Sequence, residues 1–298
     1  SPVLTLFLRV ANQRLRSLPS EAFNAIEEFT SSRPLHGKKL ILHVLDTYLG
    51  LLESPIKNNN STELTKAFVH IRCHMCKINT WWVVKQKLYE LYKLTKLLTK
   101  VVEEHKLSAN KVFIGGMSIG GTVALSLSDY LFKTNSVLKP KGVFVVDSPI
   151  DLYALYESSQ KDIARKDFTE ERLAEPKWII NYFEEQFGGK DSLLTNIQKI
   201  SPITFATKNI NNIKHLKSEK LRFYTEPDTL WLKENRQTDF ESSNAYTLQK
   251  TKELLSNYNW KNIELIQTKN KGFRINGERN PHSWSIVDID DLINWISE

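Results

Sequence analysis

Short hydrophobic runs alternate along the chain with stretches in which hydrophobic residues recur at helical spacing. Runs of β-strand length cover residues 39–45, 67–71, 111–114, 142–147, 220–224 and 263–266. Amphipathic, helix-like stretches follow several of them, most clearly at residues 82–106, 121–132 and 284–296. Strands that alternate with helices form a parallel sheet covered on both faces. The pattern therefore predicts an α/β protein built as a three-layer sandwich with a mostly parallel sheet.

The alternation is interrupted once, between the runs at residues 142–147 and 220–224. About 70 residues separate them, far more than one crossover helix needs. Helix-like stretches within the gap cover residues 151–159, 169–187 and 192–200. We therefore expect a core in two parts, residues 1–150 and 216–298, with a helical cap inserted at residues 151–215.

Composition excludes several classes of protein. The 298 residues are 41% hydrophobic and 25% charged, which is typical of a globular protein, and no apolar run approaches the ~18 residues of a membrane span. The net charge of +7 is spread along the chain, and its densest stretch, residues 85–106, has lysines at the outward positions of a helix. We expect no membrane span and no nucleic-acid partner. Cytoplasmic and exported locations both fit the sequence.

Two cysteines, Cys73 and Cys76, form a single C-x-x-C pair near the end of a predicted strand. Structural zinc sites need a second such pair or a histidine pair at set spacing, and the sequence has neither. A redox role stays open, but two thiols without a function are the favoured interpretation. We expect no metal and no cofactor.

Glycine is scarce but concentrated. Only 11 residues are glycine, and four of them lie at positions 115, 116, 120 and 121 around Ser118. The segment Gly116-Met117-Ser118-Ile119-Gly120 matches G-x-S-x-G, with an apolar strand directly before it and an apolar helix after it. In such a turn the serine is held in strained geometry at the sheet edge, and small residues on each side let strand and helix approach. We expect Gly116 and Gly120 to tolerate nothing larger than alanine.

A glycine-rich turn of this kind could also bind phosphate at the helix N-terminus. The sequence contains neither G-K-[ST] nor G-x-G-x-x-G at this place, so a phosphate site is disfavoured. We interpret Ser118 as a candidate nucleophile.

A serine nucleophile needs a base, and the base needs a carboxylate that orients it. In this type of turn the chain order is serine, acid, histidine. Only His215 and His282 follow Ser118. His215 precedes the strand at residues 220–224, so an acid placed after that strand would break the order. His282 lies in a loop before the closing helix and is the candidate base.

The acid has several candidates. Asp228 follows the strand at residues 220–224, and Glu226 lies two residues before it. Asp147 and Asp151 follow the preceding strand, although we expect Asp147 to end that strand and to shape the pocket floor. Asp228 is the favoured acid.

An oxyanion hole requires two hydrogen-bond donors. The first is expected to be the N–H of Ile119, directly after the nucleophile at a helix N-terminus. The second should come from the loop after residues 39–45, where Thr47 and Tyr48 are both candidates. That loop lacks a His-Gly-Gly run, so the Tyr48 hydroxyl is a further possibility.

These features resemble the α/β-hydrolase superfamily, particularly its esterase and prolyl-oligopeptidase-like branches. The resemblance rests on residues 113–121, on Glu226-Pro227-Asp228, on Pro281-His282-Ser283-Trp284 and on a Ser-Pro segment at residues 200–203. It implies a serine hydrolase of small carboxylic esters in which Ser118, His282 and Asp228 act together. A peptidase with the same triad and a catalytically silent binding protein are the alternatives.

Overall fold

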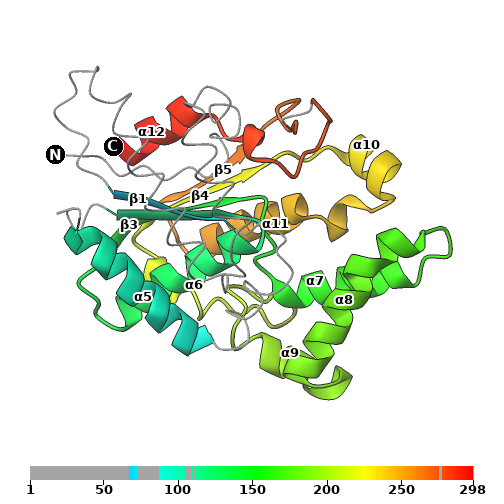
Figure 1. Ribbon diagram of the computed structural model, residues 1–298, viewed down its shortest axis with the longest axis horizontal. Coiled ribbons are helices and arrows are strands. Elements are labelled where there is room, and N and C mark those ends of the chain that lie inside the picture. The colour runs from blue at the N-terminus through cyan, green and yellow to red at the C-terminus, as the bar shows by residue number, and fades with distance from the viewer. Residues whose placement is uncertain (1–66, 73–86, 105–108, 110–111, 275–276, 298) are drawn as a thin grey trace, which may run out of the picture.

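In a computed structural model of the chain, the described residues are 67–72, 87–104, 109, 112–274 and 277–297. Within them the strands form one parallel sheet in the order β1-β2-β3-β4-β5 (Figure 1). The strands are β1 (Ala67–Arg72), β2 (Val112–Met117), β3 (Pro140–Val146), β4 (Lys220–Thr225) and β5 (Ile263–Gln267). Each strand pairs with its neighbours in the sequence, so functional residues at successive strand ends lie along one sheet edge.

Residues on the two faces of β2, β3, β4 and β5 belong to different hydrophobic clusters, which defines the three layers. Val143 and Val145 pack in the cluster that contains residues of α5 (Lys87–Glu104), α6 (Ile119–Lys133) and α11 (Asn244–Asn257). Phe144 and Val146 pack on the opposite face, against α12 (Ile289–Ser297). Figure 1 shows α12 on one side of the sheet and the other three helices on the other. The predicted three-layer α/β architecture is confirmed.

Helix α6 lies deepest of the helices that follow a strand. Twelve of its residues are buried, including small ones such as Thr122 and Ala124. A helix that is hydrophobic on nearly all sides needs cover on its outer face. Leu91 and Leu98 of α5 supply it, because they share one buried cluster with Leu125 of α6. This packing fixes the N-terminus of α6 against the ends of β2 and β3.

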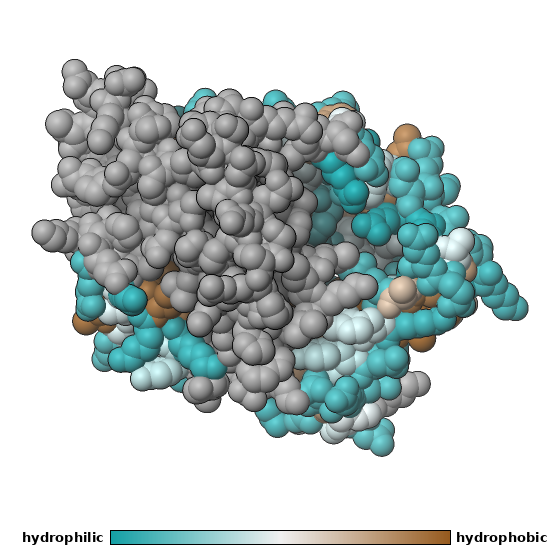
Figure 2. Space-filling model, in the orientation of Figure 1, coloured by the Kyte–Doolittle hydropathy of each residue, from teal (hydrophilic) through white to brown (hydrophobic). Residues whose placement is uncertain are grey.

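Three helices fill the interval between β3 and β4: α7 (Leu152–Ile163), α8 (Glu170–Phe187) and α9 (Lys190–Ile197). Their shared core includes Tyr156 and Phe183, and it also contains Ile119 at the start of α6. In Figure 2 the described surface on this side of the molecule is mostly hydrophilic. The helices expected here are therefore present and amphipathic. The limits of a cap at residues 151–215, and its closure over a site, stay predictions.

The largest departures from the sequence expectations lie near the C-terminus. Helix α11 was not predicted from the hydrophobic pattern. The closing helix, predicted as one element, is divided into a short 3₁₀ turn, Trp284–Ile286, and α12. Asp288 causes the division, since its carboxylate accepts hydrogen bonds from the N–H groups of Asp290 and Asp291, each at 3.1 Å. Such a side chain starts a new helix rather than continuing an old one. The strand expected at residues 39–45, and Cys73 and Cys76, lie outside the described residues.

Among the described residues, every helix is too short or too polar to cross a bilayer.

Candidate active site

Ser118 lies at a sharp turn between the end of β2 and the start of α6. Its backbone dihedrals are φ 55° and ψ −140°. A positive φ is unfavourable for a residue with a side chain and persists only where the surrounding structure imposes it. The Ser118 N–H donates a 3.0 Å hydrogen bond to the carbonyl oxygen of Val146, the last residue of β3. Ser118 is thereby held at the sheet edge beside Asp147, with its side chain half-buried.

Glycine at position 116 is required by the close approach of strand and helix. A Cβ atom there would lie 2.3 Å from the carbonyl carbon and oxygen of Gly120 and 2.7 Å from the nitrogen of Gly121. These are backbone atoms of the turn itself, which cannot rotate away. The expectation that position 116 accepts alanine is therefore wrong.

A Cβ atom on either of the two outer glycines of the window would also be too close to its neighbours, which lie in β3 for Gly115 and two residues after β3 for Gly121. A Cβ atom on Gly115 would meet the Phe144 ring at 1.9 Å, and one on Gly121 would meet the Ser148 hydroxyl at 2.1 Å. The Gly121 N–H also donates to the Ser118 carbonyl oxygen at 2.9 Å. Three of the four clustered glycines thus shape the surroundings of Ser118.

Ile119, the expected first oxyanion donor, is the first residue of α6. The opening N–H groups of a helix have no intrahelical acceptor and point toward the positive end of its dipole. Its side chain is buried among the helices between β3 and β4. Thr47 and Tyr48, the candidates for the second donor, lie outside the described residues.

His282 pairs with Asp147. The imidazole Nδ1 atom lies 2.6 Å from the Asp147 Oδ2 atom. Asp147 directly follows β3 with a positive φ of 41°, and its N–H donates to the Tyr224 carbonyl oxygen of β4 at 2.9 Å. The Thr225 hydroxyl donates to the second carboxylate oxygen at 3.3 Å. A carboxylate held on both oxygens is a fixed acceptor for the histidine.

The loop that bears His282 is ordered by its own hydrogen bonds. The His282 N–H donates to the Asn280 side-chain oxygen at 3.1 Å, and the Asn280 N–H donates to the Gly272 carbonyl oxygen at 2.9 Å. A third of the His282 side chain is exposed. With Nδ1 directed at Asp147, a proton assigned to Nδ1 leaves Nε2 as the basic nitrogen.

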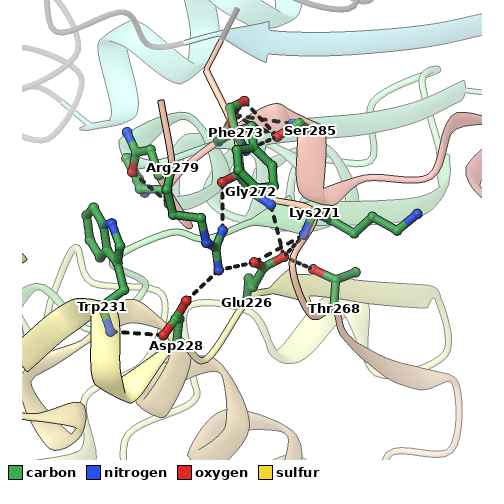
Figure 3. Close-up of polar contacts among 12 residues, drawn as sticks. Glu226, Asp228, Trp231, Thr268, Lys271, Gly272, Phe273, Arg279 and Ser285 are labelled. Atoms are coloured by element: carbon green, nitrogen blue, oxygen red, sulfur yellow. Dashed lines mark hydrogen bonds and ion pairs between the residues drawn. The ribbon is translucent and has the colours of Figure 1, made fainter. Parts of the chain in front are cut away.

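Asp228, the acid favoured from the sequence, does not lie against His282, and that expectation is wrong. Its Oδ1 atom accepts a 2.9 Å hydrogen bond from the N–H of Trp231, the last residue of the short helix α10 (Thr229–Trp231), and its Oδ2 atom accepts one of 2.6 Å from Arg279 (Figure 3). Both oxygens of Asp228 are thus used in capping a short helix and in an ion pair. Asp147, one strand earlier, occupies the position beside the histidine.

The two remaining acid candidates are also committed elsewhere. Glu226 accepts hydrogen bonds from the N–H groups of Lys271 and Gly272. Asp151 caps α7, and its Oδ2 atom accepts a further bond from the Phe205 N–H at 2.7 Å. Burial raises the pKa of Asp151, although these hydrogen bonds oppose the rise. Neither carboxylate is directed at the histidine.

Burial would raise the pKa of Glu226, but hydrogen bonds from Lys271, Thr268 and Gly272 and the charge of Arg279 outweigh it, so the pKa lies below its ordinary 4.5. A lowered folded-state pKa stabilises the fold above pH 4.5, and this contribution is lost as the pH falls through the folded value. We therefore expect the stability difference between the wild type and Glu226→Gln to be constant near neutral pH and to shrink below pH 4.5. Urea unfolding across this range measures it, and a difference that does not change with pH contradicts it.

No protein-family model and no curated protein matches the chain. Among solved structures it is similar to carboxyl esterase 2 from Tuber melanosporum, with 10% identity, a TM-score of 0.41 and coverage of 79% of this chain and 75% of that one. It is also similar to an esterase from Pyrobaculum calidifontis, with 15% identity, a TM-score of 0.36 and coverage of 70% of this chain and 56% of that one.

A glycosylation-associated protein complex from Streptococcus agalactiae is similar at 9% identity and a TM-score of 0.36, over 69% of this chain but 31% of that one. Likenesses this distant assign neither a reaction nor a substrate. The fold class follows from the structure of this chain itself: a parallel sheet between two helical layers, with a strained serine at a strand-to-helix turn, is the arrangement of an α/β-hydrolase fold.

Proposed function

We propose that the protein is a serine hydrolase of carboxylic esters in which Ser118 is the nucleophile, His282 the general base and Asp147 the residue that orients the base. One observation carries the proposal. The strained Ser118 is hydrogen-bonded through its backbone to the residue that precedes Asp147, and Asp147 lies 2.6 Å from His282. A strained serine beside an acid–histidine pair is the arrangement expected of an activated nucleophile.

The chemistry follows from these roles. His282 Nε2 removes the hydroxyl proton as Ser118 Oγ bonds to the ester carbon, and the carbonyl oxygen becomes an oxyanion. When the tetrahedral intermediate collapses, the bond to the alcohol oxygen breaks and His282 protonates the departing alcohol. Water then gives a proton to His282 and attacks the acyl carbon, and the carboxylic acid leaves as Ser118 regains its proton.

The oxyanion is stabilised by the N–H of Ile119 at the positive end of α6. Losing one donor of this kind costs roughly 10²- to 10³-fold in kcat. A second donor from Thr47 or Tyr48 completes the proposed hole. Asp147 keeps the imidazole in the tautomer with Nε2 free and stabilises the imidazolium formed at each proton transfer.

The proposed substrate is a small-molecule ester received between the sheet edge and α7, α8 and α9. Ile119 supports this placement, since it shares a buried cluster with Tyr156 and Phe183 of α7 and α8. The same contact lets these helices influence which acyl group fits.

The Ser-Pro segment at residues 200–203 bears on the peptidase alternative, because it resembles a segment of the prolyl-oligopeptidase-like branch. Ser201, in the Ser-Pro segment, is buried; its hydroxyl accepts from the Leu152 N–H at 2.9 Å and donates to the Ile203 carbonyl oxygen at 2.6 Å. These bonds give the segment a structural role in joining α7 to the chain before β4. Ester hydrolysis is therefore the conclusion we test.

A fluorophosphonate probe should label the wild type covalently and should not label Ser118→Ala. Ser128→Ala is the matched control, because Ser128 lies on α6 and its hydroxyl finds no hydrogen-bond partner in the described part of the chain. Intact mass spectrometry measures the adduct. No adduct on the wild type would support a silent binding protein. Hydrolysis of p-nitroanilides but not of p-nitrophenyl esters would support a peptidase.

A further inference from the structure

Glu226 is the most heavily hydrogen-bonded carboxylate near the site, and all its partners belong to the segment that carries His282. Its side chain is 1% exposed. Its Oε2 atom accepts from the N–H groups of Lys271 at 2.9 Å and Gly272 at 3.1 Å, and from the Thr268 hydroxyl at 2.8 Å. Figure 3 shows these donors converging on the carboxylate from residues 268–272.

Arg279 links two parts of the segment that carries His282, its own position and Gly272. Its guanidinium pairs with the Glu226 Oε1 atom and with Asp228 Oδ2, and its Nη1 atom donates to the Gly272 carbonyl oxygen at 2.6 Å (Figure 3). Three acceptors around one planar, five-donor fork fix both the position and the orientation of the side chain. Arg279 lies three residues before His282, so its placement limits where the histidine loop can lie.

We propose that Glu226 and Arg279 are positioning residues that hold the His282 loop, residues 268–274 and 277–285, at the place where His282 meets Asp147. The inference rests on the proposed function, because it assigns a purpose to the loop that carries the base. Glu226 follows β4 directly, and Asp147 is bonded to β4 through Tyr224 and Thr225. The loop and the carboxylate that orients His282 are thus anchored to the end of one strand.

The arrangement requires a carboxylate at position 226, because every group that faces the side chain is a hydrogen-bond donor. An amide in its place puts an NH₂ group either against Arg279 or against the Lys271 and Gly272 N–H groups, whichever way it is turned. Glutamine therefore keeps the size of the side chain and leaves a donor opposed by a donor. The loop must shift to separate the two opposed donors, and this shift moves His282 relative to Asp147.

The test compares Glu226→Gln and Arg279→Lys with Glu264→Gln. Glu264 is the control, since it also pairs with an arginine, the buried Arg222, but it lies on β5 and away from the loop. With p-nitrophenyl acetate we expect Glu226→Gln and Arg279→Lys to lower kcat by up to about 100-fold, the cost of misplacing a reacting group by about 1 Å, with KM little changed. Glu264→Gln should keep the wild-type kcat.

Proton NMR of the His282 Nδ1–H separates this proposal from the proposed function. A proton shared with Asp147 resonates far downfield, and its signal, identified by its loss in His282→Ala, should disappear or shift in both loop variants and persist in Glu264→Gln. This readout needs no turnover, so it applies even where the wild type fails to react with the fluorophosphonate. Arg279→Lys keeps the positive charge, so it provides the test if Glu226→Gln does not fold. An unchanged signal and kcat in a folded loop variant, or an equal loss in Glu264→Gln, overturns the proposal.

Discussion

Replacing Asp147 by asparagine should lower kcat for ester hydrolysis by about 10⁴-fold, the loss expected when a triad histidine is held in the wrong tautomer. Asparagine is nearly isosteric with aspartate, so the loop should keep its place. Its NH₂ group, however, donates to Nδ1 and leaves the proton on Nε2, where the base is needed. KM should change far less than kcat, because Asp147 acts on the histidine rather than on the substrate.

Asp228→Asn is the matched comparison for this result. It removes the same charge from a carboxylate that follows β4, but the affected contacts are with Trp231 and Arg279 rather than with His282. Because Asp228 acts on the His282 loop only through Arg279, the kcat of Asp228→Asn should fall by no more than about 100-fold, far less than that of Asp147→Asn. Steady-state kinetics on a p-nitrophenyl ester, with thermal unfolding as a check on folding, measures both variants. The reverse ranking would return the orienting role to Asp228.

The acid that orients His282 could not be chosen from the sequence alone. Chain order places an acid after β3 or after β4, and both Asp147 and Asp228 satisfy it. The choice depends on two conformations that no pattern reveals: the positive φ of 41° at Asp147, and the α10 turn that draws Asp228 to the Trp231 N–H. Arg279 pairs with both Asp228 and Glu226, but it lies about 50 residues further along the chain, and only the fold brings it to them.

The fold was more predictable than the site because burial leaves a hydrophobic signal in the sequence. The unbroken apolar run Val143-Phe144-Val145-Val146 is typical of a strand that is covered on both faces, and in β3 these residues pack into the clusters on its two faces. Helix α11 gave a weaker signal, since it is mostly polar and buries only scattered residues such as Leu248 and Leu255. The division before α12 depends on one capping side chain, Asp288, within a hydrophobic pattern that reads as continuous.

Adding a single methyl group at position 116 is expected to damage both the stability of the fold and the geometry of the site. The Cβ of Gly116→Ala would lie 2.3 Å from the Gly120 carbonyl group, so the turn between β2 and α6 must open. Overpacking in a closed site costs about 1–3 kcal/mol and sometimes more, and this contact is with backbone rather than with a flexible side chain. We expect a loss of about 3 kcal/mol in the free energy of unfolding, measured in urea.

Gly116→Ala should also lose catalytic activity, and by more than its loss of stability explains. Opening the turn moves both Ser118 and the N–H of Ile119, so the nucleophile and the oxyanion donor are displaced together. Gly189→Ala is the control, because Gly189 has a φ of −68° and a Cβ there would meet nothing within 4 Å. It should change stability by no more than about 1 kcal/mol and leave fluorophosphonate labelling intact. If Gly116→Ala is as stable and as readily labelled as this control, the strained turn is not what activates Ser118.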